Sequence, residues 1–150
     1  MINENEISYF LRMKIAMSRV VPLVREFQKE FGEERVNAVL ERINRNAVKE
    51  AEKSVSLEPN FEEAAKAIEI FAADDALEYE ILKQDNESLE FNVTRCRYKQ
   101  MMEELDATDI GHLLICDTDF ATALLFGMRL ERTQICMQGA DHCDFRYSTR

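Results

Sequence analysis

Over the first 73 residues, apolar side chains recur at the three- and four-residue spacing of amphipathic helices. The pattern predicts a first helical segment from Ile7 to Phe31, with Gly32 as a C-cap. Pro22 falls inside this segment and predicts a kink or a fresh helix start, because proline lacks the N–H that a helix interior uses. A second amphipathic helix is predicted around residues 36–47, where apolar residues share one face.

Asn60 and Glu63 predict the start of a third helix, because their three-residue spacing resembles a capping box. The hydrophobic period then changes to two, and residues 76–95 predict a β-hairpin. A helix is expected after Cys96, where the second strand of this hairpin ends.

Thr108 is a candidate N-cap for the next helix, which Gly127 closes. A terminal hairpin is predicted with arms at 128–137 and 142–148, because apolar and polar residues alternate again in the second arm. On the helix between Thr108 and Gly127, five residues share one face by their spacing: Leu113, Cys116, Asp117, Phe120 and Leu124.

These elements predict an α+β fold in which N-terminal helices pack on an antiparallel sheet. The sheet would consist of two β-hairpins separated by two helices. We expect a single domain over residues 1–150, with a helical layer at 1–73 and a hairpin-helix-helix-hairpin half at 74–150.

Net charge and the distribution of apolar residues argue against several kinds of partner and location. The 150 residues carry a net charge of −10, which argues against nucleic acid or an anionic membrane as a partner. The acidic start at residues 1–6 has no apolar signal core, and no apolar run approaches the roughly 20 residues of a membrane span. We therefore expect a cytoplasmic protein whose four cysteines are reduced thiols, and a sheet edge through which it could form a homodimer.

The cysteines are candidates for nucleophilic chemistry, which requires a thiol of lowered pKa. Cys96 lies between Arg95 and Arg97 at a predicted helix start, and this surrounding should lower its pKa. Cys116 instead lies beside Asp117 and Asp119, which should raise its pKa unless a cation folds over it. For each thiol, the alternative is a small buried side chain in the core.

A zinc site is a second interpretation of the same residues. Cys116, Cys136 and Cys143, with His142 or an aspartate, could supply four ligands. The sequence contains no CxxC or HExxH motif, so we expect no metal or other cofactor and keep zinc as the alternative.

Acidic side chains supply a third candidate. Asp117 and Asp119 lie on adjacent turns of a helix with apolar neighbours, where a carboxylate is costly unless it is paired or used. His142, in the terminal hairpin turn beside Cys143, could serve as a general base.

The second half of the chain resembles the L-2-amino-thiazoline-4-carboxylic acid hydrolase family over residues 76–148. The resemblance is carried, in order, by Phe91-Asn-Val-Thr-Arg-Cys96-Arg-Tyr98, Ile115-Cys116-Asp117-Thr118-Asp119, Arg132-Thr133-Gln134 and Gly139-Ala-Asp-His-Cys143-Asp144-Phe145-Arg146-Tyr147. It implies a hydrolase that opens a C–N or C–S bond of a cyclic, amidine-like isothiourea that bears a carboxylate.

The resemblance suggests roles for the candidate residues. Asp117 or Asp119 could hold the amidinium group, and Arg95 or Arg132 the substrate carboxylate. The attacking group could be a thiol or a water molecule activated by an aspartate or His142. We expect catalytic residues among Cys96, Cys116, Asp119 and His142, and substrate-binding residues among Arg95, Asp117, Arg132, Cys143 and Asp144.

The ending Gly-x-x-x-Cys-x-Phe is also similar to that of 4-vinyl reductase domains, which bind small molecules and in some members hold zinc through cysteines. This similarity gives the alternative function, a ligand-binding or sensor domain without catalysis. Strand alternation places Cys143 on the same face as Phe145 and Tyr147, which predicts that this face belongs to the core.

Overall fold

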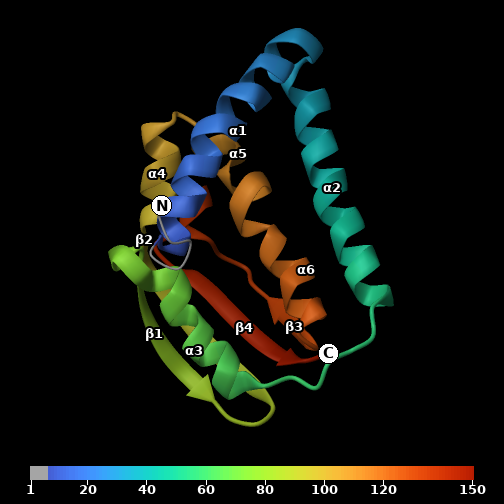
Figure 1. The fold of residues 1–150 in the computed structure, drawn as a ribbon, viewed down its shortest axis with the longest axis vertical. Coiled ribbons are helices and arrows are strands. Elements are labelled where there is room, and N and C mark those ends of the chain that lie inside the picture. Colours follow the sequence, from blue (N-terminus) through green and yellow to red (C-terminus); the bar gives the residue numbers. More distant parts are fainter. Residues whose placement is uncertain (1–6) are drawn as a thin grey trace.

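The computed structural model describes residues 7–150, so the acidic segment 1–6 lies outside the described residues. Helices α1 (Tyr9–Phe31) and α2 (Glu33–Lys53) form a long hairpin that projects from the rest of the molecule (Figure 1). Gly32 caps α1 as predicted and turns the chain with a φ of +91°, a conformation that glycine adopts without steric cost.

A single helix runs through Pro22, so a fresh helix start at that position was a wrong expectation. The proline itself is exposed, and the apolar stripe continues on the buried side of α1 both before and after it. Burial of this stripe holds the helix together across the one hydrogen bond that proline removes. The buried residues of the stripe are Phe10, Met17, Val21 and Val24.

Helix α3 (Phe61–Ala72) begins as the sequence predicted. The side-chain oxygen of Asn60 accepts a hydrogen bond of 3.0 Å from the Glu63 N–H, which satisfies one of the free donors at the helix start. A short turn at Ala73–Asp75 then leads into the sheet.

Four antiparallel strands form one sheet in the order β1-β2-β4-β3. The predicted hairpins are joined through their second strands, with Phe91 opposite Phe145, and the α+β class is confirmed. The strands are β1 (Leu77–Gln84), β2 (Ser88–Cys96), β3 (Met128–Glu131) and β4 (Cys143–Thr149).

The arm predicted at 128–137 is too long, because β3 ends at Glu131. The Asp144 carboxylate accepts the backbone N–H groups of Thr133 and Gln134, which are therefore not available to continue the strand pairing. The chain leaves the sheet and forms a 3₁₀ turn, η4 (Cys136–Gln138), before it returns as β4.

Between the hairpins lie α4 (Arg97–Glu104), α5 (Thr108–Gly111), a π turn η3 (His112–Cys116) and α6 (Thr118–Leu125). The sequence predicted one uninterrupted helix after Thr108, and the π turn corrects this expectation. Thr108 is also not an N-cap: Ala107 holds that position and makes no side-chain capping bond.

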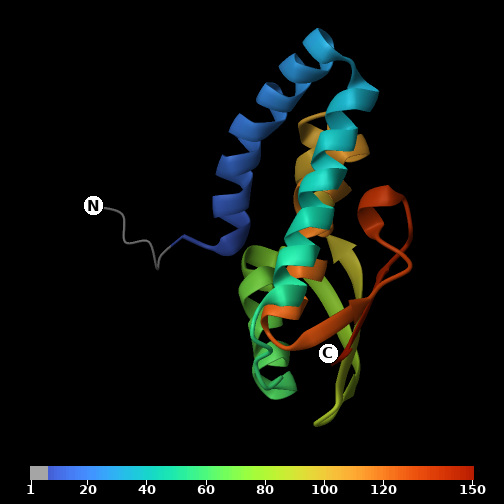
Figure 2. The ribbon, with the colours of Figure 1, turned by 90° about the vertical axis from the view of Figure 1, so that its right-hand side faces the viewer.

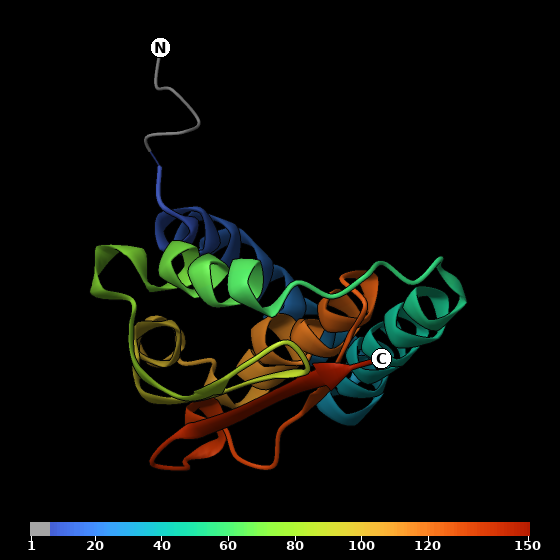
Figure 3. The same ribbon diagram turned by 90° about the horizontal axis from the view of Figure 1, so that it is seen from below.

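Helices cover only one face of the sheet, as the view from below shows (Figure 3). The inner face is apolar, with Phe91, Val93 and Cys143 buried, and the core that they join also contains Phe10 from α1. Turned by 90°, the molecule shows α1 and α2 diverging from their shared tip toward the sheet (Figure 2). Within residues 7–150, no helix combines the length and the apolar character that a membrane span requires.

Candidate functional site

A buried ion pair joins α6 to the segment that follows β3. Arg132 Nη1 donates to Asp119 Oδ2 at 2.8 Å, and Arg132 Nη2 donates to the Cys116 carbonyl oxygen at 3.0 Å. The same Nη2 lies 3.9 Å from Asp117 Oδ1. The Arg132 side chain is only 3% exposed, so its charge is balanced inside the protein by these partners.

Two aromatic rings lie close to the guanidinium group. The Arg132 Cζ atom lies 5.0 Å from the ring centroids of both Phe120 and Phe145. Cation–π contacts of this kind stabilise a desolvated cation and fix its plane. On the inner face of β4, the Phe145 and Tyr147 rings are parallel at 6.1 Å, which extends the aromatic wall along the strand.

We refer to Asp119, Arg132, Cys116, Phe120, Phe145 and Tyr147 as the Asp119 cluster.

Asp119 is the member of this cluster whose acidity the surroundings change in the physiological range. Burial raises the pKa of Asp119 to about 6, although the Arg132 charge and hydrogen bond oppose that rise. The side chain nevertheless keeps 39% of its surface accessible, and its Oδ1 makes no hydrogen bond to any described residue. A desolvated carboxylate with one accessible oxygen can bind a cation, accept a proton from water or return it.

The π turn accounts for part of this geometry. The Asp117 N–H bonds to the His112 carbonyl oxygen, five residues back, at 2.8 Å. Nearby carbonyl oxygens accept side-chain donors, including Leu113 from Asn44 at 2.9 Å and Cys116 from Arg132 at 3.0 Å. Single π turns inside helices occur often at functional sites.

The cysteines lie near one another and near Asp119: the Asp119 charge acts on the pKa of both Cys96 and Cys116, and Cys143 acts on that of Cys116. Cys136 and Cys143 are in contact, with the Cys136 N–H 3.2 Å from Cys143 Sγ. Burial raises the pKa of Cys96, Cys116 and Cys143, so the thiols are protonated at neutral pH.

A lowered pKa at Cys96 was therefore a wrong expectation. Backbone N–H groups of Tyr98 and Lys99 do lower it, but burial has the larger effect. The flanking arginines point elsewhere: Arg97 Nη1 donates to the Asp74 carbonyl oxygen at 2.6 Å, and Arg95 Nε pairs with Glu78 at 2.7 Å.

Asp144 lies on the opposite face of β4 from Phe145 and organises the loop that carries Arg132. Its carboxylate accepts the Thr133 N–H at 2.8 Å, the Thr133 hydroxyl at 2.5 Å and the Gln134 N–H at 2.7 Å. Burial works against ionisation, but these hydrogen bonds outweigh it and hold the pKa of Asp144 below its ordinary value.

Arg95 and His142 are not brought into the Asp119 cluster. Arg95 is exposed at the end of the first hairpin and pairs with Glu78. His142 Nδ1 lies 2.5 Å from Asp141 Oδ1 in the loop before β4. Of the nine residues predicted for the site, the structure gathers six: Cys96, Cys116, Asp117, Asp119, Arg132 and Cys143. Asp144, a seventh, binds the backbone next to Arg132 from the other face of β4.

The aromatic residues Phe120, Phe145 and Tyr147 are site components that the sequence prediction did not include. Burial raises the pKa of Tyr147, and the nearby Asp119 charge raises it further, so its hydroxyl stays protonated as a donor. The alternation of β4 placed Tyr147 in the core; its polar hydroxyl was the available signal for a site, since such a group needs a partner.

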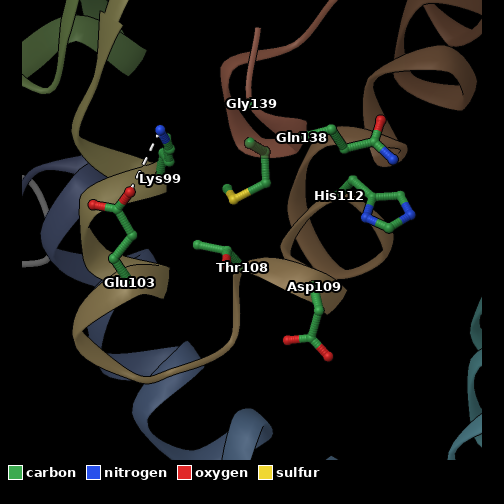
Figure 4. A pocket seen from close by; sticks show the side chains of 8 residues that line it. Lys99, Glu103, Thr108, Asp109, His112, Gln138 and Gly139 are labelled. Carbon is green, nitrogen blue, oxygen red and sulfur yellow. Dashed lines mark ion pairs between the residues drawn. The ribbon is translucent and has the colours of Figure 1, made fainter.

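A separate hollow of about 490 Å³ lies on the side of α4, α5 and η4 (Figure 4). Its charged groups are already paired: Lys99 with Glu103 at 3.4 Å and Asp109 with Arg25 at 2.7 Å. We place the candidate site at Asp119 instead, where a perturbed carboxylate remains accessible. The hollow is lined by Lys99, Glu103, Thr108, Asp109, His112, Met137, Gln138 and Gly139.

No group of three or more His, Cys, Asp or Glu side chains within residues 7–150 is arranged to hold a metal ion. The cysteine positions that could supply zinc ligands lie near one another, but without the convergence that coordination at about 2.3 Å requires.

Comparison with known proteins gives one clear assignment. No curated protein matches the sequence significantly, whereas 13 chains of solved structures do match. One is the phenol-responsive sensory domain of the transcription activator PoxR with phenol, at 14% identity and a TM-score of 0.46, covering 85% of this chain and 71% of that one. A sequence profile of the L-2-amino-thiazoline-4-carboxylic acid hydrolases matches residues 10–147, which is nearly the whole chain, and the protein therefore belongs to that family.

Proposed function

We propose that the protein is a hydrolase that opens a cyclic isothiourea or a similar cyclic amidine at its C–S or C–N bond. Family membership supports the reaction type. The single observation that carries the proposal is Asp119, a carboxylate with an accessible Oδ1 and a pKa raised to about 6, held in place by the buried Arg132. A pKa near the working pH suits a group that both accepts and returns a proton.

In the proposed reaction, Asp119 Oδ1 takes a proton from a water molecule whose oxygen attacks the ring carbon between nitrogen and sulfur. The C–S bond breaks as the added oxygen becomes the urea carbonyl and its remaining proton passes to the ring nitrogen. The sulfur receives the proton held by Asp119, and the products are a urea and a thiol in one molecule. Arg132 is a positioning residue, because its contacts are to Asp119, Cys116 and the two flanking rings. The cysteines need not attack, since burial keeps them as thiols.

The alternative is a ligand-binding domain without turnover, and one observation favours it. Phe91 and Phe145 stack at 4.7 Å with an angle of 8° between their planes, and Tyr147 continues the row. Such a wall would hold a planar ligand whether or not Asp119 acts on it.

Thiol release from cyclic isothioureas separates these functions. The purified protein is incubated with 2-amino-thiazoline-4-carboxylate and with related cyclic isothioureas. The thiol that it releases is compared with the thiol released by the Asp119→Asn variant. Turnover that Asp119→Asn abolishes supports the hydrolase. Stoichiometric binding with neither released thiol nor loss of the ligand in mass spectrometry supports the ligand-binding domain, because opening at the C–N bond would consume the ligand without releasing a thiol. Asp141→Asn is the matched control, because Asp141 is 92% exposed and lies outside the Asp119 cluster.

A further inference from the structure

The helical hairpin of α1 and α2 carries exposed apolar side chains near its tip. Along its length α1 contacts α3 and α4, and α2 contacts α6 and η3. Near Gly32 the two helices project beyond these elements (Figure 2). Five large apolar residues there keep between 40% and 57% of their surface accessible, and we refer to them as the hairpin surface: Leu23, Phe27 and Phe31 on α1, Val39 and Ile43 on α2.

The apolar residues of α1 lie on the side of the helix that faces away from α5. Arg25 identifies the opposite side, because its Nη2 atom lies 2.7 Å from Asp109 Oδ1 on α5. Leu23 and Phe27 are each two residues from Arg25, which corresponds to about 200° around the helix axis. Phe31 continues the row, and its ring centroid lies 6.2 Å from that of Phe27. The three residues therefore form one apolar stripe.

The apolar residues of α2 face the same way. Asn44 points toward η3, since its side-chain nitrogen donates to the Leu113 carbonyl oxygen at 2.9 Å. Ile43 and Val39 lie about 100° and about 140° around the axis from Asn44, in the same direction. Because α5 and η3 pack on one side of the hairpin, the two stripes lie together on its other side.

The size of the hairpin surface is typical of the core of a protein interface. With about half of each side chain accessible, its five residues expose on the order of 400 Å². Apolar atoms make up about 55–65% of a protein–protein interface, so this core would belong to an interface of roughly 700 Å² per copy. Stable complexes bury about 800 Å² per partner.

Charged residues of opposite sign border the hairpin surface. On α1, Glu30 lies seven residues after Leu23 and therefore in the same row, at the outer edge. On α2, Arg35 and Arg42 are seven residues apart and line the opposite edge, next to Val39. All three charged side chains are exposed, and none takes part in an ion pair within the described residues. The surface thus has an acidic rim on α1 and a basic rim on α2.

This distribution of charge suits a second copy of the chain. A two-fold axis that runs along the hairpin exchanges the α1 and α2 sides, so the acidic rim of one copy meets the basic rim of the other. The whole chain carries −10, but residues 23–45 carry no net charge, so two copies repel each other least where the hairpins meet. The segment has five basic and five acidic residues: Arg25, Lys29, Arg35, Arg42 and Arg45, and Glu26, Glu30, Glu33, Glu34 and Glu41.

We propose that the hairpin surface joins two copies of this chain into a homodimer, in which α1 and α2 of both copies form a four-helix bundle. The five apolar residues would be the buried core of the interface, and the two rims would fix the relative orientation of the copies. The surface is separate from the Asp119 cluster and from the edges of the sheet, so the proposal is independent of the hydrolase function.

Sedimentation of the full chain between about 1 and 100 μM tests the dimer, which should have twice the mass of one chain. Ile43→Glu should raise the dimer Kd at least about tenfold, because it places a charge in the apolar core of the interface. Ile70→Glu is the matched control, since Ile70 lies on α3 and is 59% exposed, against 57% for Ile43. Circular dichroism checks that both variants are folded.

A charge exchange between the rims tests the two-fold arrangement. Glu30 and Arg35 lie at similar heights near the tip, so Glu30→Arg alone and Arg35→Glu alone would each bring like charges together and raise the dimer Kd. The double variant restores opposite charges and should bring the Kd back toward that of the unmodified chain.

Three results would overturn the proposal. A chain that stays monomeric up to about 100 μM would leave the hairpin surface to a different protein partner. A dimer that Ile43→Glu leaves intact, or that Ile70→Glu weakens equally, would use another surface. A double variant that dimerises no better than Glu30→Arg alone would overturn the two-fold pairing of the rims.

Discussion

Arg132 and Asp119 form a pair in which only one partner is accessible: the guanidinium side chain is 3% exposed and the carboxylate 39%, with 2.8 Å between Nη1 and Oδ2. The buried cation fixes the carboxylate through Oδ2, while Oδ1 makes no hydrogen bond to any described residue. This asymmetry is the basis of the acid–base role proposed above for Asp119.

Asp119→Asn should lower kcat/KM for a cyclic isothiourea by about 10²–10⁴-fold, the usual contribution of an acid–base group. In the unmodified protein, kcat/KM should rise with pH through about 6, because the ionised carboxylate accepts the proton. A pH–rate profile with thiol detection measures both effects. Retention of most activity in Asp119→Asn, with Asp141→Asn as reference, would remove Asp119 from the mechanism.

Protein stability should also depend on Asp119. The folded state holds the Asp119 proton more tightly than the unfolded chain does, since its pKa is about 6 against an ordinary value near 3.9. The stabilisation from that proton is present below about pH 4 and is lost as the pH rises through about 6. Asp119→Asn has no such proton to lose.

Urea unfolding between pH 4 and 7 should therefore show the unmodified protein losing free energy of unfolding relative to Asp119→Asn. Asp141→Asn should follow the unmodified protein, because Asp141 is 92% exposed. Parallel curves for all three proteins would show that Asp119 is not desolvated.

Arg132→Lys should keep the charge but lose the planar contacts to Phe120 and Phe145 and the second hydrogen bond. We expect the free energy of unfolding to fall by about 1–3 kcal/mol. The midpoint of the pH–rate profile should move above 6, because Arg132 lowers the pKa of Asp119. Arg146→Lys, on the outer face of β4, is the matched control and should leave the midpoint in place.

Cys96→Ser and Cys116→Ser should each change turnover by less than about tenfold, because protonated thiols are weak nucleophiles. Iodoacetamide should label the folded protein slowly at pH 7.5 and the urea-unfolded protein quickly, as mass spectrometry can measure. A loss of several hundredfold in Cys96→Ser without unfolding, or a covalent substrate adduct, would instead identify a thiol nucleophile.

Asp144→Ala should destabilise the segment that carries Arg132, because it removes three hydrogen bonds to Thr133 and Gln134. We expect a loss of about 1–3 kcal/mol in the free energy of unfolding. Asp144→Asn keeps one acceptor oxygen and should lose less. If thermal unfolding shows that both variants equal the unmodified protein, Asp144 does not organise this segment.

Local patterns were sufficient to predict much of the fold. The alternation in β2 and β4 identified both hairpins, and the spacing of Asn60 and Glu63 located the start of α3. Contacts between distant residues explain the failures. Nothing near Glu131 in the sequence shows that the Asp144 carboxylate will accept the N–H groups of Thr133 and Gln134 and so end β3 at Glu131.

The candidate site, like the fold, was predicted only in part. The spacing of Cys116 and Asp119 correctly brought two members together on neighbouring turns. The direction of a side chain was not predictable, so the arginines beside Cys96 suggested an activated thiol, whereas Arg95 pairs with Glu78 and Arg97 turns toward Asp74. Burial then decides the pKa, and burial depends on the whole fold.

The π turn at His112–Cys116 makes the length of this segment critical to a single residue. Removing one residue there would restore regular helical bonding but rotate everything downstream by about 100° around the helix axis. Asp119 would then point away from Arg132, although every residue of the Asp119 cluster would still be present. Insertions and deletions between residues 112 and 116 should thus be excluded among relatives that keep this site.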